Sequence, residues 1–421
     1  MNSEITNRKR RVLVLTSSYP KRLREPSSIF LQHLSKALSD QGWQMTVLAP
    51  NFPGGAAREA MEGVEVVRFN YFLPGWQTLC YGSGVPTNLR ANPLLWLQVP
   101  SFLSAMHRQA ARLIRQRKVD LIQAHWIIPQ GAVARGLKRK YQIPVVLTAH
   151  GADAFSFQTP LGRFMKRFGL QTADACAVNS LYTKTILEKL LPGLNPWVIP
   201  MGIWLEQFEK LQDGEGIRRQ LGIQGPLLLF VGRLVEKKGA EYLIRALPAV
   251  LQNFPQATLL IVGEGALSQD LRNLASVLGV SPSIRFLGRL PNQDLPSYFM
   301  AADVFVGPSI VDAKGDTEGL GIVFLEAAAA SLPIVGTGVG GSGEFLVEGV
   351  TGILVPQRDP YSLGQAICQV LAEPELRNRL GWAARQKVVE SFTWQQVAAK
   401  YSSLFVDTLA NFKGSSSAFS R

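Results

Sequence analysis

The sequence predicts an α/β protein built from two doubly wound, Rossmann-like domains that face each other across a cleft. Its 421 residues are more than one ordinary domain holds. Short apolar segments alternate with helical segments along most of the chain, a pattern typical of parallel sheets with crossover helices. A segment rich in Pro and Gly, residues 192–204, divides the strands into two sets and indicates an interdomain hinge.

The hinge gives expected domains at residues 1–198 and 199–392. Strands of the first domain are expected at residues 12–16, 45–49, 64–69, 121–125, 144–150 and 175–179. Strands of the second domain are expected at residues 227–232, 258–265, 284–288, 304–309 and 333–337. Each is a short apolar run bounded by turn residues, as buried strands usually are.

A last helix is expected at residues 393–412, with an unusually wide apolar stripe. Its apolar side chains recur at helical spacing and are Trp394, Val397, Ala398, Tyr401, Leu404, Phe405, Leu409 and Phe412. So wide a stripe must pack on something beyond the domain that the helix follows. Residues 413–421 are predicted to be a disordered tail.

The net charge of +13 lies entirely in the first half of the chain. Residues 1–200 contain 25 Lys and Arg but only 10 Asp and Glu. This imbalance indicates an anionic partner such as a membrane surface, or a solvated basic face that aids solubility. Nucleic acid is disfavoured as a partner, because no recognised binding module accompanies the charge.

Residues 71–106 are poor in charge and rich in aromatic side chains. They form either a hydrophobic lip that touches lipid, with Trp76 and Trp96 as anchors, or a long loop packed on the first sheet. No segment approaches the roughly 18 unbroken apolar residues that a membrane span needs. Three scattered cysteines form neither a disulfide framework nor a metal site, which predicts a cytoplasmic protein.

A cationic pair follows the first strand of the second domain. Ligands of open parallel sheets bind at the carboxyl ends of strands, where backbone amides point outward. The loop GRLVEKKG places Arg233 and Lys238 five residues apart at such an end. Two cations beside free amides suit a diphosphate, although an isolated pair of this kind would be ordinary surface charge.

Two carboxylates in EGLGIVFLE are candidates for binding hydroxyl groups. If a helix begins near Gly321, Glu318 lies just before it and Glu326 in its second turn. Eight residues leave the two side chains about 80° apart, so both can face one side. Burying an unpaired carboxylate is costly, so Glu326 needs a partner, either an arginine or a ligand hydroxyl. A diphosphate site beside vicinal hydroxyls indicates a sugar nucleotide.

Two other patterns carry weaker signals. Gly338, Gly340 and Gly343 match GxGxxG, with Asp359 at the distance that dinucleotide folds use, but they come late in the chain. A nicotinamide oxidoreductase is therefore an alternative that nothing else supports. No Asp-x-Asp and no His/Cys cluster with metal-ligand spacing occurs, which predicts that the protein carries no metal.

Two histidines end neighbouring expected strands of the first domain. His125 ends LIQAH and His150 ends PVVLTAH, with Asp153 three residues after His150. The chain has four histidines in all, so two at strand ends suggest a site, although a structural histidine is the commoner outcome.

Five motifs in one order resemble a known family. They are FVGRLVEKKG, VGEG, FLGRLPNQDLPSYFMAADVFVGPS, EGLGIVFLE and GGSGEFLVEGVTGILVP. Together they make the chain similar to the retaining glycosyltransferases of family 4, which have the two-domain GT-B fold. The match covers roughly residues 200–390. In the first half, TAHGAD and AHWIIPQG resemble bacterial members that build exopolysaccharide or wall polymers, teichuronic acid enzymes among them.

The resemblance implies a donor site in the second domain. Arg233 and Lys238 would hold the donor diphosphate, and Glu326 the ribose hydroxyls. Glu318, with the backbone of Leu320 and Gly321, would hold the transferred sugar. The base would lie near two segments, Arg285 to Gly288 and Gly263 to Gly265.

The resemblance also implies roles in the first domain, which would bind the acceptor. His150 would have a supporting catalytic role near the reacting sugar, and His125 would line the acceptor side. The last helix would cross back to pack on this domain.

The function implied is retaining transfer of a sugar from a nucleotide-sugar donor to a glycan or lipid-linked acceptor, without metal or another cofactor. The expected setting is cell-surface polysaccharide biosynthesis in the cytoplasm, at the inner face of the membrane. A sugar-nucleotide epimerase on the same fold is the alternative, but it would need no basic acceptor surface. A catalytically inactive sugar-nucleotide binding module is disfavoured by the complete set of donor residues.

Overall fold

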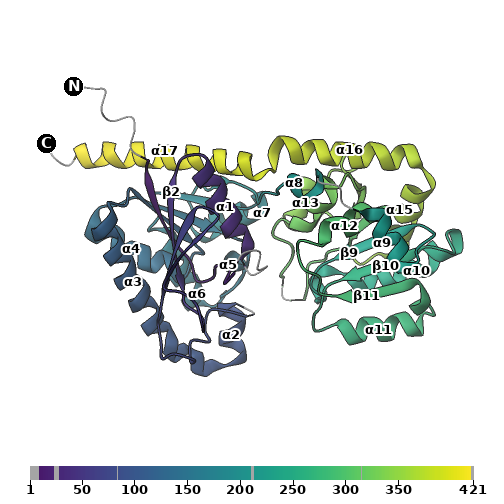
Figure 1. Ribbon diagram of the computed structural model, residues 1–421, viewed down its shortest axis with the longest axis horizontal. Coiled ribbons are helices and arrows are strands. Elements are labelled where there is room, and N and C mark those ends of the chain that lie inside the picture. The colour runs from purple at the N-terminus through teal and green to yellow at the C-terminus, as the bar shows by residue number, and fades with distance from the viewer. Residues whose placement is uncertain (1–8, 23–27, 83, 210–212, 314, 419–421) are drawn as a thin grey trace. The chain divides into compact units, whose positions relative to one another are not determined.

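The computed structural model describes residues 9–22, 28–82, 84–209, 213–313 and 315–418. The chain divides into two compact units, unit 1 (residues 1–200 and 394–421) and unit 2 (residues 201–393). Each unit contains one largely parallel sheet with helices around it (Figure 1). The predicted fold class, with two doubly wound α/β domains, is confirmed.

The described part of unit 1 has a sheet in the order β3-β4-β2-β1-β5-β6-β7-β8. Its strands are β1 Arg11–Leu15, β2 Gln44–Pro50, β3 Arg58–Met61, β4 Val64–Phe69, β5 Leu121–His125, β6 Val145–Ala149, β7 Ala175–Val178 and β8 Trp197–Val198. All neighbouring strands are parallel except β3 and β4, which form an antiparallel hairpin. The helices are α1 Ile29–Asp40, α2 Val85–Ala91, η1 Pro93–Leu97, α3 Gln98–Arg117, α4 Gln130–Tyr141, α5 Ala152–Phe155, α6 Pro160–Leu170 and α7 Leu181–Leu190.

The described part of unit 2 has a wholly parallel sheet in the order β11-β10-β9-β12-β13-β14. Its strands are β9 Leu227–Val231, β10 Thr258–Val262, β11 Ile284–Gly288, β12 Val304–Gly307, β13 Ile334–Gly336 and β14 Ile353–Leu354. The helices are α8 Glu206–Glu209, α9 Gly214–Leu221, η2 Glu236–Lys238, α10 Ala240–Asn253, α11 Ser268–Val277, η3 Ser281–Ser283, α12 Leu295–Ala301, α13 Ile322–Ala329, α14 Ser342–Phe345, α15 Pro360–Ala372 and α16 Pro374–Ser391.

The strand order of unit 2 creates a switch point between β9 and β12. The chain moves outward from β9 through β10 to β11 and then returns to form β12 on the other side of β9. Loops that leave two such strands part in opposite directions, and this leaves a crevice at their carboxyl ends. The loops after β9 and β12 contain Lys238 and Glu318, so the topology brings these two predicted residues to one place.

The last helix, α17 (Trp394–Ala418), packs on unit 1 as predicted. In Figure 1 the yellow helix lies beside the purple elements near the amino terminus. Trp43 Nε1 donates a hydrogen bond to Ser402 Oγ at 2.9 Å, and the Trp43 ring meets Phe405 edge-on. Trp394, Tyr401 and Phe405 are buried, so the apolar stripe is used in this contact.

The predicted disordered tail needs a correction. The α17 backbone stays helical through residue 418, six residues beyond the predicted end, and residues 419–421 lie outside the described part. Gly414 and the serines that follow have low helix propensity, but the segment contains no proline that would exclude a helical backbone.

Residues 71–106 include α2, η1 and the start of α3 and are partly packed on the core, while contact with lipid stays a prediction. Leu79, Leu89 and Phe102 are buried in the core of unit 1. Other large apolar side chains of the same segment stay exposed, namely Leu73, Trp76, Leu94, Trp96 and Leu97. Among the described helices, none is long and apolar enough to cross a lipid bilayer.

Candidate active site

Glycines bring three strand ends of unit 2 close together. Gly263 follows β10 with φ 134°, and a Cβ there would lie 1.9 Å from the carbonyl oxygen of Gly232 after β9. Its N–H donates to the Gly288 carbonyl at the end of β11 (2.7 Å). Only glycine permits this approach, because any side chain at residue 263 would collide with backbone. The carboxyl edge of the sheet therefore presents backbone without side-chain bulk at Gly263, in the segment where the family resemblance places the base.

A fourth glycine closes the switch point. Gly239 ends the turn after η2 with φ 67°, and a Cβ there would lie 1.8 Å from the carbonyl oxygen of Pro308, just after β12. This contact holds the loop after β9 against the segment after β12. Lys238, next to Gly239, therefore projects at the point where the two loops part.

Two adjacent lysines hold the segment that carries the first predicted carboxylate. Lys238 Nζ forms an ion pair with Glu318, and the two side chains are only 14% and 11% exposed. Lys237 Nζ lies 3.0 Å from Asp316 and donates to the Thr317 carbonyl at 3.1 Å. A nearly buried ion pair responds strongly to loss of either partner, because the remaining charge is left uncompensated.

The glycine-rich motif after β13 supports Glu318 rather than a dinucleotide. Gly341 N donates to the Glu318 carbonyl at 2.9 Å, and a Cβ at Gly340 would lie 2.2 Å from the same oxygen. The helix that follows, α14, has only four residues, whereas a dinucleotide fingerprint opens a full helix. Asp359 caps α15 by accepting hydrogen bonds from Tyr361 N and Ser362 N. The nicotinamide alternative is therefore not supported by Gly338, Gly340, Gly343 and Asp359.

Glu326 is half-buried and has no hydrogen-bonding partner among the described residues. Helix α13 begins at Ile322 after Gly321, which has φ 75°, so Glu326 lies in the second turn as predicted. Burial raises the pKa of Glu326 from 4.5 to about 7, and the nearby charge of Lys238 opposes the rise. Within the described residues its carboxylate forms no side-chain hydrogen bond and no ion pair with an arginine. The arginine explanation offered by the sequence is therefore not supported, and the carboxylate remains free to accept from a ligand.

The two predicted arginines differ in position. Arg233 is exposed in the loop after β9, one residue beyond Gly232. Arg285 is the second residue of β11 and lies opposite Leu260, three residues before the strand ends at Gly288. At about 3.3 Å per residue, Arg285 is about 10 Å from the carboxyl edge, so the structure does not bring it to the other predicted residues.

Sequence reasoning missed Glu264 at this edge. A Cβ at Gly288 would lie 3.4 Å from Glu264 Oε1, so this carboxylate extends over the end of β11. The motif VGEG could have indicated Glu264. It is a polar residue between Gly263 and Gly265, two positions at which a side chain would collide with backbone.

The two predicted histidines of unit 1 are in direct contact. Strands β5 and β6 are parallel neighbours, so the residues at their ends meet. His125 Nδ1 lies 2.8 Å from His150 Nε2, and the rings stack with an interplanar angle of 14°. Asp153 holds the segment by accepting from the backbone N–H groups of His150 and Ile127, both at 2.9 Å.

Both imidazoles are neutral at physiological pH. Burial lowers the pKa of His150 to about 3. Burial, together with the charge of His150, lowers the pKa of His125 well below its ordinary value. His150 Nδ1 has no hydrogen-bond partner among the described residues, so this nitrogen is the free position of the pair. A neutral ring with one free nitrogen is suited to hold a hydroxyl group, not to carry charge.

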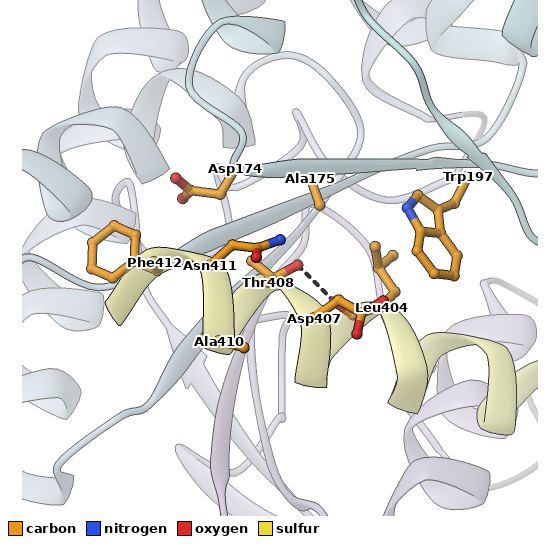
Figure 2. A pocket seen from close by; sticks show the side chains of 9 residues that line it. All are labelled: Asp174, Ala175, Trp197, Leu404, Asp407, Thr408, Ala410, Asn411 and Phe412. Atoms are coloured by element: carbon orange, nitrogen blue, oxygen red, sulfur yellow. Dashed lines mark hydrogen bonds between the residues drawn. The ribbon is translucent and has the colours of Figure 1, made fainter. Parts of the chain in front are cut away.

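A cavity of about 390 Å³ elsewhere in unit 1 contains none of these residues. Figure 2 shows that it lies beside α17 and the ends of β7 and β8. Its lining consists of Asp174, Ala175, Trp197, Leu404, Asp407, Thr408, Ala410, Asn411 and Phe412. Asp174 is already bound to Lys138 Nζ and Val145 N, and Thr408 donates to the Leu404 carbonyl. The polar groups of this cavity therefore serve the packing of α17.

Two family descriptions match successive parts of the chain. "Glycosyltransferase Family 4" matches residues 27–207, and "Glycosyl transferases group 1" matches residues 214–387. The chain is 32% identical over 307 residues to a GDP-mannose-dependent monoacylated alpha-(1-6)-phosphatidylinositol monomannoside mannosyltransferase of Corynebacterium glutamicum, covering 71% of this chain and 78% of that protein. A D-inositol 3-phosphate glycosyltransferase of the same species is 30% identical over 353 residues, with 77% and 82% covered.

Solved structures share the fold. Sucrose-phosphate synthase from Thermosynechococcus elongatus superposes with a TM-score of 0.78 at 23% identity, covering 96% of this chain and 100% of that chain. The Anabaena protein HepE, solved with UDP and glucose, gives a TM-score of 0.69 at 20% identity, with 94% and 100% covered. With these matches and its two parallel-sheet units, the chain belongs to the GT-B glycosyltransferases of group 1 and family 4.

Proposed function

We propose that the protein is a retaining, metal-independent hexosyltransferase that moves a sugar from a nucleotide donor to a glycan or lipid-linked saccharide. The observation that carries the proposal is Glu326, a half-buried carboxylate without a hydrogen-bond partner among the described residues, near the ion pair of Lys238 and Glu318. A nucleotide sugar would bring hydroxyl groups to Glu326 and a diphosphate to Lys238.

The donor site would work by electrostatic stabilisation. As the bond between the anomeric carbon and the phosphate oxygen breaks, negative charge develops on the leaving diphosphate. Lys238, Arg233 and backbone N–H groups at the start of α13 would stabilise it. The acceptor hydroxyl attacks on the same face, and its proton passes to the leaving phosphate. Glu318 would bind the transferred sugar, and the base would lie on the backbone from Gly263 to Gly265.

His150 would support this reaction as a neutral hydrogen-bonding group. Its low pKa argues against a role as a charged acid at neutral pH, and its free Nδ1 can hold a sugar hydroxyl. His125, stacked on the other side, would fix the ring and line the acceptor side.

The names of the relatives support a lipid-linked acceptor. One relative acts on a phosphatidylinositol monomannoside with GDP-mannose. We place this protein in the cytoplasm at the inner face of the membrane, in the synthesis of cell-surface polysaccharide. The basic excess of residues 1–200, with 25 Lys and Arg against 10 Asp and Glu, supports that placement.

A thermal-shift panel tests the donor site directly. UDP, GDP, ADP, their common sugar conjugates and NAD are each added to wild type and to Glu326→Ala. We expect one nucleotide family to raise the melting temperature of wild type, and the shift to be lost in the variant. Stabilisation of both proteins alike, or stabilisation by NAD, would contradict the proposed site.

Removal of divalent metal is expected to leave transfer intact. The charges proposed to stabilise the diphosphate come from Lys238, Arg233 and backbone amides, so no bound ion is required. Initial rates are compared with and without excess EDTA, and added Mg²⁺ serves as the control. Strict loss of activity in EDTA, restored by Mg²⁺, would show that the leaving diphosphate needs a metal.

A further inference from the structure

Helix α6 of unit 1 differs from an ordinary surface helix in which side chains it buries and which it exposes. It buries Gly162, Lys166, Gly169 and Leu170, and turns its other four large apolar side chains outward. These lie at positions i, i+3, i+4 and i+7 and form one row, namely Leu161 (69% exposed), Phe164 (65%), Met165 (40%) and Phe168 (39%). Single exposed apolar residues are common, but a continuous row on one helix face indicates an interaction surface.

The orientation of α6 is fixed by close backbone packing. A Cβ at Gly169 would lie 2.6 Å from the Ile127 carbonyl oxygen, and a Cβ at Gly131 in α4 would lie 3.0 Å from Gly169 Cα. Lys166 Nζ donates to the carbonyls of Ala154 and Ser156, both at 2.8 Å. Rotating α6 to bury its apolar row would drive side chains into α4 and leave the Lys166 charge unsatisfied. The row therefore stays outside.

Positive charge borders the row. Arg163 and Arg167 are exposed on the flank of α6 beside Phe164, about 100° and 60° from it around the helix, and the Arg135 guanidinium of α4 lies 4.2 Å from the centre of the Phe168 ring. Exposed apolar side chains flanked by arginines are typical of helices that lie in the interface of an anionic bilayer. A second copy of the chain is a poorer fit, because pairing two such faces would bring their arginines together.

We propose that α6 docks the protein on an anionic lipid bilayer. Leu161, Phe164 and Met165 enter the boundary between headgroups and acyl chains, while Arg163 and Arg135 contact lipid phosphates. The sequence points to Trp76 and Trp96 for such a role, whereas the structure assigns it to a different element. This surface does not depend on the donor site, so the two proposals can fail separately.

Vesicle cosedimentation of the full-length protein tests the surface. The vesicles contain equal amounts of phosphatidylglycerol and phosphatidylcholine, with pure phosphatidylcholine as reference. Wild type is expected to bind the anionic vesicles, and high salt to release it. The double variant Leu161→Ser/Phe164→Ser is expected to bind at least tenfold more weakly, because two large apolar side chains no longer enter the interface. Arg163→Glu is expected to weaken binding too and to reduce its salt dependence.

The matched control is Leu94→Ser/Leu97→Ser, which removes two equally exposed side chains (72% and 74%) from the other apolar segment of unit 1. It should bind like wild type, and unchanged circular dichroism should show that all variants are folded. Glu326→Ala should also bind vesicles normally, which separates docking from the donor site. The proposal is overturned if wild type ignores anionic vesicles, or if the control loses binding and the α6 variant does not. It is also overturned if the α6 variant converts a dimer to a monomer in sedimentation without lipid.

Discussion

Replacing Lys238 with methionine is expected to lower the rate of sugar transfer at least a hundredfold. Methionine keeps an unbranched apolar side chain but removes the charge that pairs with Glu318 and is proposed to meet the donor diphosphate. A hundredfold loss corresponds to about 2.7 kcal/mol, which is the worth of one charge-assisted hydrogen bond. The measurement is the initial rate of nucleotide release over a range of donor concentrations. The melting temperature should fall as well, because Glu318 is left without its partner.

The neighbouring residue provides the control. Lys237→Met removes an equal charge one residue away, but its partner Asp316 is 42% exposed, so the loss of transfer should stay below tenfold. If Lys238→Met keeps more than half of the wild-type rate, the proposed diphosphate site is wrong. Equal losses in both variants would mean that the lysines position residues 316–318 and that neither one binds the donor.

Strands were predictable where a run of mostly apolar residues is bounded by turn residues. The expected segments 64–69, 121–125 and 284–288 match β4, β5 and β11 residue for residue. Three edge strands were missed for the opposite reason. Strand β3 reads REAM and shows little apolar pattern, while β8 and β14 have two residues each. Pairing with a neighbour, and not their own composition, makes these segments strands.

The site was predictable only as far as topology determines it. Lys238 and Glu318 meet because their loops leave β9 and β12, the two strands at the switch point. Arg285 lies early in β11, opposite Leu260, and its part in the site stays a prediction, because a motif identifies a segment without telling which end of a strand the side chain occupies. Helix α6 could not be predicted at all from periodicity. An apolar row in a sequence is normally assigned to the core, and the glycines that reverse α6 act through the backbone of α4, which no local pattern reveals.

Replacing Glu326 with glutamine is expected to stabilise the folded protein above pH 7 and to impair transfer. Burial raises the pKa of this carboxyl from 4.5 to about 7 in the folded state. The unfolded chain therefore releases the proton above pH 4.5, while the folded protein keeps it until about pH 7. The free energy of unfolding must fall as pH rises through this window, and the cost is complete above pH 7. At 1.36 kcal/mol per pKa unit, the cost is about 3 kcal/mol.

Glutamine resembles the protonated carboxyl in shape and carries no charge, so the variant lacks this cost. Urea unfolding at pH 8 should show Glu326→Gln to be more stable than wild type by about 3 kcal/mol, and the difference should shrink to less than about 1 kcal/mol at pH 5. Glu375→Gln, a change at an exposed position in α16, should show no such dependence on pH. Transfer should fall at least tenfold in Glu326→Gln, because an amide offers one acceptor oxygen to two ribose hydroxyls where the carboxylate offers two.

The stability measurement and the transfer rate together distinguish a carboxylate that binds a ligand from one that only destabilises the fold. Greater stability together with lost transfer is the combination expected of a group kept for function at a cost to the fold. A variant that is more stable and fully active would show that Glu326 is buried but does not bind the donor. Equal stability differences at pH 5 and pH 8 would show that the pKa of the Glu326 carboxyl is not raised in the folded protein. The argument that this carboxylate is kept for binding ribose would then lose its premise.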